Sequence, residues 1–182
     1  MGQPETAQLP RWPFALDPDK AVEAVVFLVA RVKEPSLHSV AKVLYHADKL
    51  HLSRYGRPIT GDWYVAMKFG PVPSATYDIL KTLRGDAKFP LPERASALKV
   101  EGQYVVRATR KADAGVLSVS ECECLEASAT EHGRKSFDER TADSHGPAWE
   151  AADENGMIRL ESLLLEIDNR EELRSFFLHD DS

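Results

Sequence analysis

The segment from Tyr55 to Pro73 constrains the fold of this 182-residue chain more than any other stretch, because glycines and prolines punctuate its backbone throughout. Proline holds its φ angle near about −65°, and glycine takes up left-handed conformations that other residues avoid. Between them, residues 63–67 alternate in the way that is typical of a short strand. The segment therefore predicts a rigid turn, a strand and a second turn that together join two helices.

Two helices are predicted before this segment. Asp17-Pro18 has the form of a helix start, with Asp as the N-cap and Pro at the first helical position, and Glu34-Pro35 should end that helix. Ser36 is expected to cap the next helix, over 37–54, and Gly56 to terminate it. The apolar residues of this second helix recur at helical spacing, so its polar residues should face solvent.

A third helix and a hairpin are predicted after the segment. The residues from Gly70 to Pro73 should break the strand, and Ser74 should cap a helix that Gly85 closes. Apolar alternation on both sides of Glu101-Gly102 indicates two antiparallel strands over 98–100 and 103–106. An isolated hairpin is marginal in water, so we expect it to pair with the 63–67 strand in one small sheet.

The second half of the chain is predicted to be helical. Ser118 and Ser136 each precede a glutamate by three residues, which is the pattern of a capping box. We expect their helices to end at His132 and near Ser144, a short helix to follow Gly146-Pro147, and terminal helices over 160–167 and 171–178. The fold class is therefore α+β and mostly α-helical, with about six to eight helices and a small antiparallel sheet of two to three strands.

Composition indicates a cytoplasmic protein. The N-terminus lacks the basic and apolar regions of a signal peptide, and the longest apolar run, 24–30, is too short to span a membrane. Cys122 and Cys124 are one residue apart, on nearly opposite faces of a helix, so neither a disulfide nor a shared metal ion is expected. We expect reducing surroundings and no membrane association.

The sequence offers no constellation that points to catalysis or to a cofactor. A G-x-S-x-G elbow is absent, and the glycines are spaced wrongly for a phosphate-binding loop. His46, Asp48 and His51 lie within six residues, but only Asp48 and His51 could share a helix face, and two ligands do not make a metal site. We expect these side chains to face solvent, and we expect no metal, no cofactor and no enzyme activity.

Protein recognition is the class that remains. Basic residues interleave with aromatics only around 42–68, where Asp48 and Asp62 interrupt them, so a nucleic-acid surface is not favoured. Tyrosine and tryptophan on rigid turns are typical of protein interfaces, because they bury a large area with few rotatable bonds. Alternatively, Trp63, Tyr64 and Phe69 fill the core beneath the sheet.

Residues 42–78 resemble the opening of the Panacea domain, also called the SocA-like antitoxin domain. In that family a helix of the form K-L-x-Y-x-A-[DEQ] leads to G-x-P-[IL]-[TF]-x-[DE]-x-[FIY]-x-A-x-x-x-G-P-[VI]. The corresponding stretches here are 42–48 and 56–72. The likeness returns more loosely around His145 and Trp149, and it spans about residues 20–160.

Residues 1–16, with three prolines, should form an extended N-terminal arm, and residues 161–182 an acidic C-terminal helical extension packed on the domain. The resemblance covers neither segment. It implies a small α-rich domain, which we place over residues 17–160. It also implies an antitoxin of a bacterial toxin–antitoxin system, which binds and neutralises a cognate protein toxin encoded nearby. Some members are described as proteolytic adaptors that hand the toxin to a Clp-type unfoldase–protease. The family offers no catalytic residue to carry over, so the candidates for toxin binding or for the fold are the motif residues Tyr45, Asp48, Asp62, Tyr64, Lys68, Pro71, His145 and Trp149.

Several alternatives stay open. A buried Asp62 that caps the turn or pairs with Lys68 would serve the fold and not the toxin. A DNA-binding transcriptional autoregulator would need a basic face on the 37–54 helix, and an enzyme would need a pocket that joins Asp48, His51 and Asp62. Residues 150–182 hold ten acidic and three basic residues, against a net charge of −6 for the whole chain. This acidic end is either a docking segment for a basic partner or a protease, or a solvated helix face.

Overall fold

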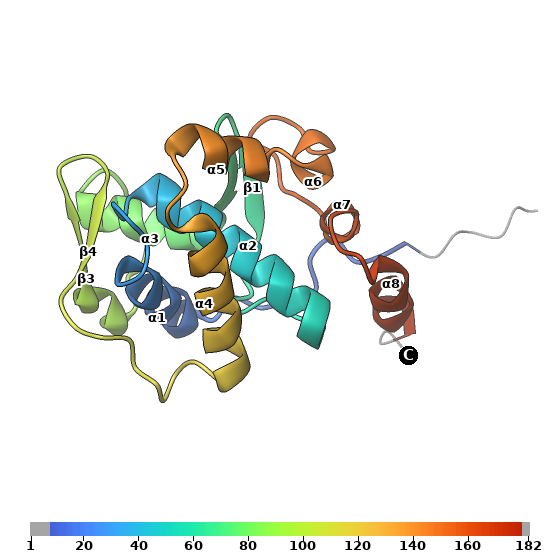
Figure 1. The fold of residues 1–182 in the computed structure, drawn as a ribbon, viewed down its shortest axis with the longest axis horizontal. Coiled ribbons are helices and arrows are strands. Elements are labelled where there is room, and N and C mark those ends of the chain that lie inside the picture. The colour runs from blue at the N-terminus through green and yellow to red at the C-terminus, as the bar shows by residue number, and fades with distance from the viewer. Residues whose placement is uncertain (1–7, 180–182) are drawn as a thin grey trace, which may run out of the picture.

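The longest helix, α2 (Leu37–Tyr55), runs through the middle of the molecule, and the other elements pack around it (Figure 1). The computed structural model describes residues 8–179. The remaining elements, in chain order, are α1 (Pro18–Val29), β1 (Tyr64–Met67), β2 (Gly70–Pro73), α3 (Ser74–Arg84), the 3-10 helix η1 (Glu93–Ala97), β3 (Leu98–Glu101), β4 (Val105–Ala108), α4 (Val119–His132), α5 (Phe137–Ser144), α6 (Pro147–Glu150), α7 (Leu160–Leu164) and α8 (Arg170–His179). Over the described residues this is a mostly helical α+β fold, as predicted.

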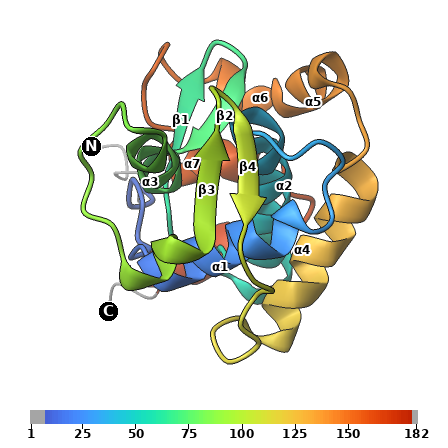
Figure 2. The same ribbon diagram turned by 90° about the vertical axis from the view of Figure 1, so that its left-hand side faces the viewer.

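Two separate antiparallel hairpins, β1–β2 and β3–β4, replace the single sheet that we expected (Figure 2). The β3–β4 hairpin bonds instead to the start of α2, where the N–H of Leu37 donates to the carbonyl of Tyr104 at 2.9 Å. The residues from Gly70 to Pro73, expected to break the strand, form β2 themselves. Pro73 pairs with Tyr64 in the ladder. The carbonyl of Tyr64 accepts a hydrogen bond from the N–H of Ile158 on the opposite edge of β1. The missing N–H of Pro73 therefore leaves no acceptor of β1 unsatisfied.

The helix signals in the sequence are confirmed at most ends. Asp17 caps α1 through its side chain, and Ser36, Ser118 and Ser136 each form a capping box. The predicted end of the first helix at Glu34-Pro35 is wrong, because α1 stops at Val29 and residues 30–34 turn toward α2. The predicted 160–167 helix is shorter, and Phe176, expected on the apolar side of the last helix, is exposed.

Two hydrophobic clusters lie on opposite sides of α2. The larger one joins α2 to α1, α3, α4 and β3–β4, and the smaller one joins it to β1, α7, α8 and the residues before α1. Trp12 pins those N-terminal residues, since its Nε1 donates to the carbonyl of Gly61 at 2.9 Å. Residues 1–7 of the predicted arm and residues 180–182 of the extension lie outside the described part of the chain.

Enclosure by two clusters buries the polar side of α2. Lys42, Asp48 and His51 are 1%, 2% and 0% exposed, so the prediction that the polar residues of this helix face solvent is wrong. The physical reason is that the 55–73 segment and α4 supply polar partners to that side. No helix within residues 8–179 is long and apolar enough to cross a membrane.

Candidate functional site

Asp48 ties α2 to the turn that precedes β1. Its buried carboxylate accepts hydrogen bonds from the N–H of Ile59 at 2.7 Å, from the hydroxyl of Thr60 at 3.3 Å and from the hydroxyl of Tyr64 at 2.7 Å. Burial raises the pKa of Asp48 to about 6, although these donors oppose the shift. The carboxylate satisfies donors inside the fold and is closed to a partner.

Asp62 caps α3, although it lies twelve positions before the first residue of that helix. It accepts from the N–H of Ala75 at 3.1 Å, and from the N–H and hydroxyl of Thr76 at 2.8 and 2.9 Å. The predicted Ser74 cap is wrong, because Pro73 holds the N-cap position and no neighbouring side chain caps the helix. Asp62 is fully buried and serves the fold, but it does so by capping α3 and not through the turn or Lys68.

Tyr45 and Tyr64 lie edge to face in the smaller cluster, with ring centres 5.0 Å apart. The hydroxyl of Tyr45 donates to Glu166 at 2.9 Å, and Lys49 contacts the same oxygen at 2.6 Å. The other Glu166 oxygen accepts from the N–H of Ala148 at 3.0 Å. Sequence reasoning missed Glu166, and its only signal was a lone acid within an apolar run.

Lys42 on α2 packs against the strand β2. Its buried amino group donates to the carbonyl of Pro71 at 2.8 Å, and burial lowers its pKa to about 7. Gly70 leaves room for this side chain, because a Cβ there would lie 2.8 Å from Lys42 Cε and 2.3 Å from Ser144 Oγ. Pro71 is buried and contributes its backbone carbonyl to this contact.

Lys68, His145 and Trp149 are the motif candidates that solvent reaches. Lys68 lies in the turn between β1 and β2, with its amino group 5.2 Å from the ring centre of Phe69. The rings of His145 and Trp149 stack at 3.7 Å, and Trp149 Nε1 donates to the carbonyl of Met67 at 2.8 Å. The other five candidates, Tyr45, Asp48, Asp62, Tyr64 and Pro71, are buried.

The enzyme alternative needed a pocket that joins Asp48, His51 and Asp62, but these three side chains face the interior of the fold. All three are buried, and His51 is held between the carbonyl of Arg57 at 2.7 Å and the hydroxyl of Ser120 at 3.1 Å. Within residues 8–179, no three His, Cys, Asp or Glu side chains gather as metal ligands.

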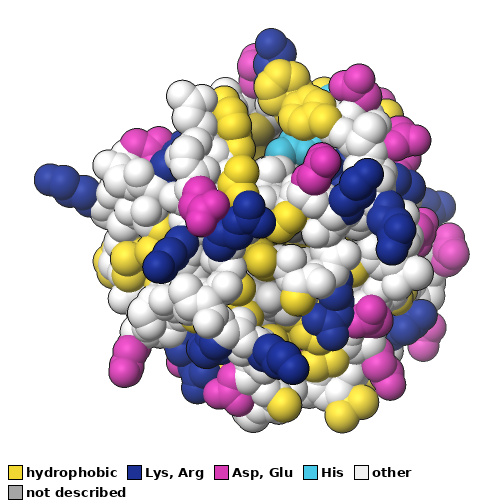
Figure 3. Space-filling view, turned by 60° about the vertical axis from the view of Figure 1, so that its left-hand side comes forward, with side chains coloured by type: hydrophobic (Ala, Val, Ile, Leu, Met, Phe, Trp, Pro, Cys, Tyr) yellow, Lys and Arg dark blue, Asp and Glu magenta, His cyan; other side chains and the backbone are white. Residues whose placement is uncertain are grey.

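An apolar groove of about 640 Å³ opens between the tips of the two hairpins and the starts of α2 and α5. We call it the hairpin groove; its lining includes Leu37, Met67, Phe69, Val72, Tyr77, Tyr104 and Phe137. Figure 2 shows the two hairpin tips and α5 at one end of the molecule, and Figure 3 shows hydrophobic side chains beside a histidine on this side. Phe69, Tyr104 and Phe137 are 48%, 62% and 44% exposed. Tyr64 thus fills the core, whereas Phe69 is available for recognition.

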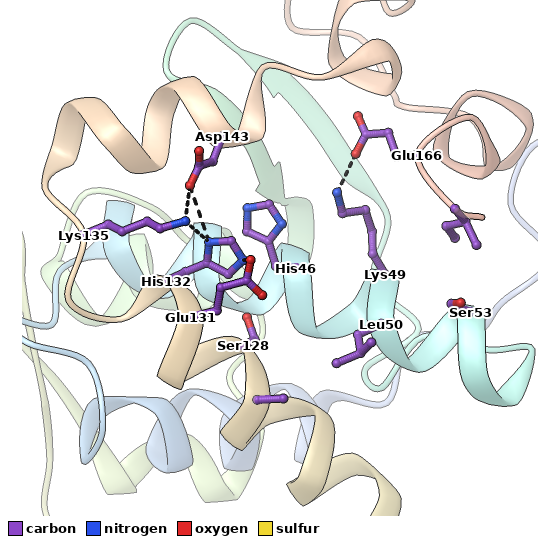
Figure 4. Close-up of a pocket in the computed structure, with 12 residues that line it drawn as sticks. His46, Lys49, Leu50, Ser53, Ser128, Glu131, His132, Lys135, Asp143 and Glu166 are labelled. Atoms are coloured by element: carbon purple, nitrogen blue, oxygen red, sulfur yellow. Dashed lines mark hydrogen bonds and ion pairs between the residues drawn. The ribbon is translucent and has the colours of Figure 1, made fainter. Parts of the chain in front are cut away.

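A second, polar pocket of about 440 Å³ lies between α2, α4 and α5 (Figure 4). His46 stacks on His132 with ring centres 3.8 Å apart, and burial lowers the pKa of both. Lys135 pairs with Asp143 at one side and Lys49 with Glu166 at the other. The charges of this pocket are therefore largely matched within the fold.

Comparison with protein families identifies the domain that carries the buried motif. The family model described as the antitoxin SocA-like, Panacea domain matches residues 40–150, which is more than half of the chain. The chain belongs to this family. No curated protein and no solved structure matches it. The resemblance stated from the sequence is confirmed.

Membership in the Panacea family implies the antitoxin role of a toxin–antitoxin system, and with it a toxin as partner. Antitoxins of this kind are in general not enzymes. The matched part runs from within α2 to α6 and contains both aspartates and both hairpins. It also contains the lining of the hairpin groove except Ser36, Leu37 and His38. α1, α7, α8 and Glu166 lie outside it, so the Panacea domain is completed here by segments that the family model does not cover.

Proposed function

We propose that this chain binds and neutralises a cognate protein toxin encoded beside it, and that the toxin docks on the hairpin groove. The observation that carries the proposal is the groove itself, where Phe69, Tyr104 and Phe137 remain exposed although they are large and apolar. Covering such side chains supplies most of the affinity at many interfaces. Most of the motif residues are buried, and we assign them the task of holding the hairpins in place.

Co-expression with the protein encoded beside this chain tests the proposal. The wild-type chain should suppress that protein's toxicity and purify with it as a complex. Replacing both Phe69 and Phe137 by serine should abolish protection, whereas Phe176→Ser is the matched control, because Phe176 is equally exposed on α8. If the wild-type chain fails to protect the host, the antitoxin role is wrong. If the double variant protects fully, the toxin does not dock on the hairpin groove.

We also propose a subordinate role as a proteolytic adaptor, in which a Clp-type unfoldase–protease docks on the acidic C-terminal end. Its support is that Glu161, Glu171 and Glu172 are exposed there. This role is tested by measuring the half-life of the toxin in cells with and without the chain. An unchanged half-life would exclude delivery to a protease and would mean that the chain only blocks the toxin. We place the pair in the cytoplasm, where the free thiols of Cys122 and Cys124 would stay reduced.

The alternative of a DNA-binding autoregulator gains no support from the structure. It required a basic face on α2, but Lys42 is buried and Lys49 is paired with Glu166.

A further inference from the structure

Beside the hairpin groove, a pocket of about 830 Å³ contains a buried arginine whose hydrogen bonding is incomplete. Arg140 on α5 is 7% exposed, and its Nε and Nη1 atoms donate to no group among residues 8–179. Burial lowers the pKa of Arg140 even though Glu34 and Glu139 attract its charge. A buried guanidinium without acceptors is unfavourable, so a molecule that supplies acceptors here gains binding free energy.

The surroundings of Arg140 carry an excess of positive charge. Its pocket is lined by five bases, Lys33, Arg107, Arg134, Lys135 and Arg140, and by two acids, Glu34 and Glu139. Lys135 pairs with Asp143 and Arg107 with Glu101, so the excess rests on Lys33, Arg134 and Arg140. Glu139 is already engaged, because its carboxylate accepts from the N–H of Ser136 at 2.7 Å in the cap of α5. Lys33 and Arg134 are exposed at the rim, where they attract anions in advance of contact. We call this site the arginine pocket.

The arginine pocket and the hairpin groove share a wall. Ser36 and Phe137 line both, and the ring of His38 stacks on Phe137 at 3.9 Å. One segment of a partner laid across Phe137 can therefore place an apolar side chain on one side and an anionic group on the other. The chain's own ends do not supply this segment within the described residues, because Leu9 and α8 pack in the smaller cluster at the far end of the molecule (Figure 1).

We propose that the arginine pocket receives the carboxylate of an aspartate or glutamate on the toxin, from a segment whose neighbouring apolar side chain fills the hairpin groove. A carboxylate that pairs with either edge of the Arg140 guanidinium forms two parallel N–H···O bonds. One edge includes Nε and the other Nη1, so the pairing supplies an acceptor to one of these two donors. The partner's identity rests on the proposed function, whereas the missing acceptors of Arg140 do not. The two sites together define the docking chemistry as an acidic residue next to an apolar one.

Affinity for the toxin, measured by titration calorimetry with the full chain, tests this inference. Arg140→Gln should weaken binding at least about 10-fold and leave thermal stability equal or higher, because it removes an unmatched buried charge. Arg134→Glu, at an exposed position, should also weaken binding and reduce its salt dependence. Arg159→Gln, an exposed arginine beyond the smaller cluster, is the control and should bind as the wild type does. If Arg140→Gln and Arg134→Glu both neutralise the toxin and bind it with unchanged affinity, the inference is wrong. The proposed function would still hold in that case.

A toxin-free experiment keeps the two proposals separable. The arginine Nε–H signals of the labelled full chain are followed by NMR during titration with acetyl-Glu-Leu-Glu-amide, and separately with acetyl-Gln-Leu-Gln-amide. The Arg140 signal should move with the glutamate peptide and stay in place with the glutamine peptide. No movement, equal movement with both peptides, or a larger movement with a short DNA oligonucleotide overturns the carboxylate assignment.

Discussion

Asp48, Thr60 and Asp62 form a chain of polar contacts at the scale of single residues. The hydroxyl of Thr60 donates to Asp48 at 3.3 Å and accepts from the N–H of Asp62 at 3.2 Å. These hydrogen bonds connect α2 to α3 through the turn. Each carboxylate accepts from backbone N–H groups that have no partner within a helix or a sheet. These aspartates are therefore structural members of the Panacea motif.

Removal of the Asp62 carboxylate should destabilise the chain. Asp62→Ala is expected to lower the free energy of unfolding by about 2 kcal/mol, because α3 loses its cap and the N–H of Thr76 is left without an acceptor. Urea denaturation followed by circular dichroism measures the change. Asp78→Ala, which removes only a half-exposed pair with Lys81, should cost less than about 0.5 kcal/mol. Equal effects of the two substitutions would contradict the capping role.

Asp48 should make stability decrease as pH rises. Its pKa is about 6 in the folded state against an ordinary 3.8, so the folded chain holds the proton more tightly than the unfolded chain. The stabilising contribution is present at low pH and is lost between about pH 4 and 6, by up to about 3 kcal/mol. Unfolding free energies of the wild type and of Asp48→Asn, compared across this window, should converge or cross as pH rises. A constant difference would show that Asp48 does not titrate there.

Elements with complete local signals were predictable from the sequence. The serines that begin α2, α4 and α5, and the glycines that end α2 and α4, lie beside the helix ends they stabilise. Nothing distant is therefore needed to recognise them. The burial of α2 was not predictable, because the partners of Lys42 and Asp48 lie eleven or more residues away. The hairpin groove was hidden for the same reason, since Phe69, Tyr104 and Phe137 meet only in the folded chain.

The hairpin β1–β2 should be sensitive to any side chain at Gly70. Gly70 and Gly85 have nearly equal left-handed φ angles, 102° and 99°, but a Cβ at Gly85 meets nothing within 4 Å. Gly85→Ala should therefore show only the backbone cost, about 1 kcal/mol. Gly70→Ala should cost about 2 kcal/mol more, because it must displace Lys42 or Ser144 in a packed interior. Thermal unfolding of the two variants measures this difference, and equal values would contradict the packing of Lys42 under β2.

The whole molecule consists of two clusters that α2 connects. Glu166 is the polar link on the side of the smaller cluster, where it contacts α2 through Tyr45 and Lys49 and the start of α6 through Ala148. Removing it would leave these donors without an acceptor at the boundary of α7 and α8. The division into an arm over 1–16, a domain over 17–160 and an extension over 161–182 stays a prediction.

Glu166→Ala should loosen the C-terminal end without unfolding the rest. We expect hydrogen exchange in α7 and α8 to accelerate roughly 30-fold, which corresponds to about 2 kcal/mol of local opening free energy, while α1 and α4 stay protected. Glu172→Ala, an exposed acid on α8, should leave exchange unchanged. Faster exchange throughout the chain would instead indicate that both clusters unfold as one unit.

The enclosure of α2 has a consequence for synthesis. Residues 37–55 leave the ribosome well before α4, which lies against them, and before Glu166, which bonds to Tyr45 and Lys49. The nascent chain therefore holds its buried lysine, aspartate and histidine in an unfinished environment until these later segments have emerged. The smaller cluster is therefore completed only after Glu166 has emerged, more than 100 residues after the end of α2.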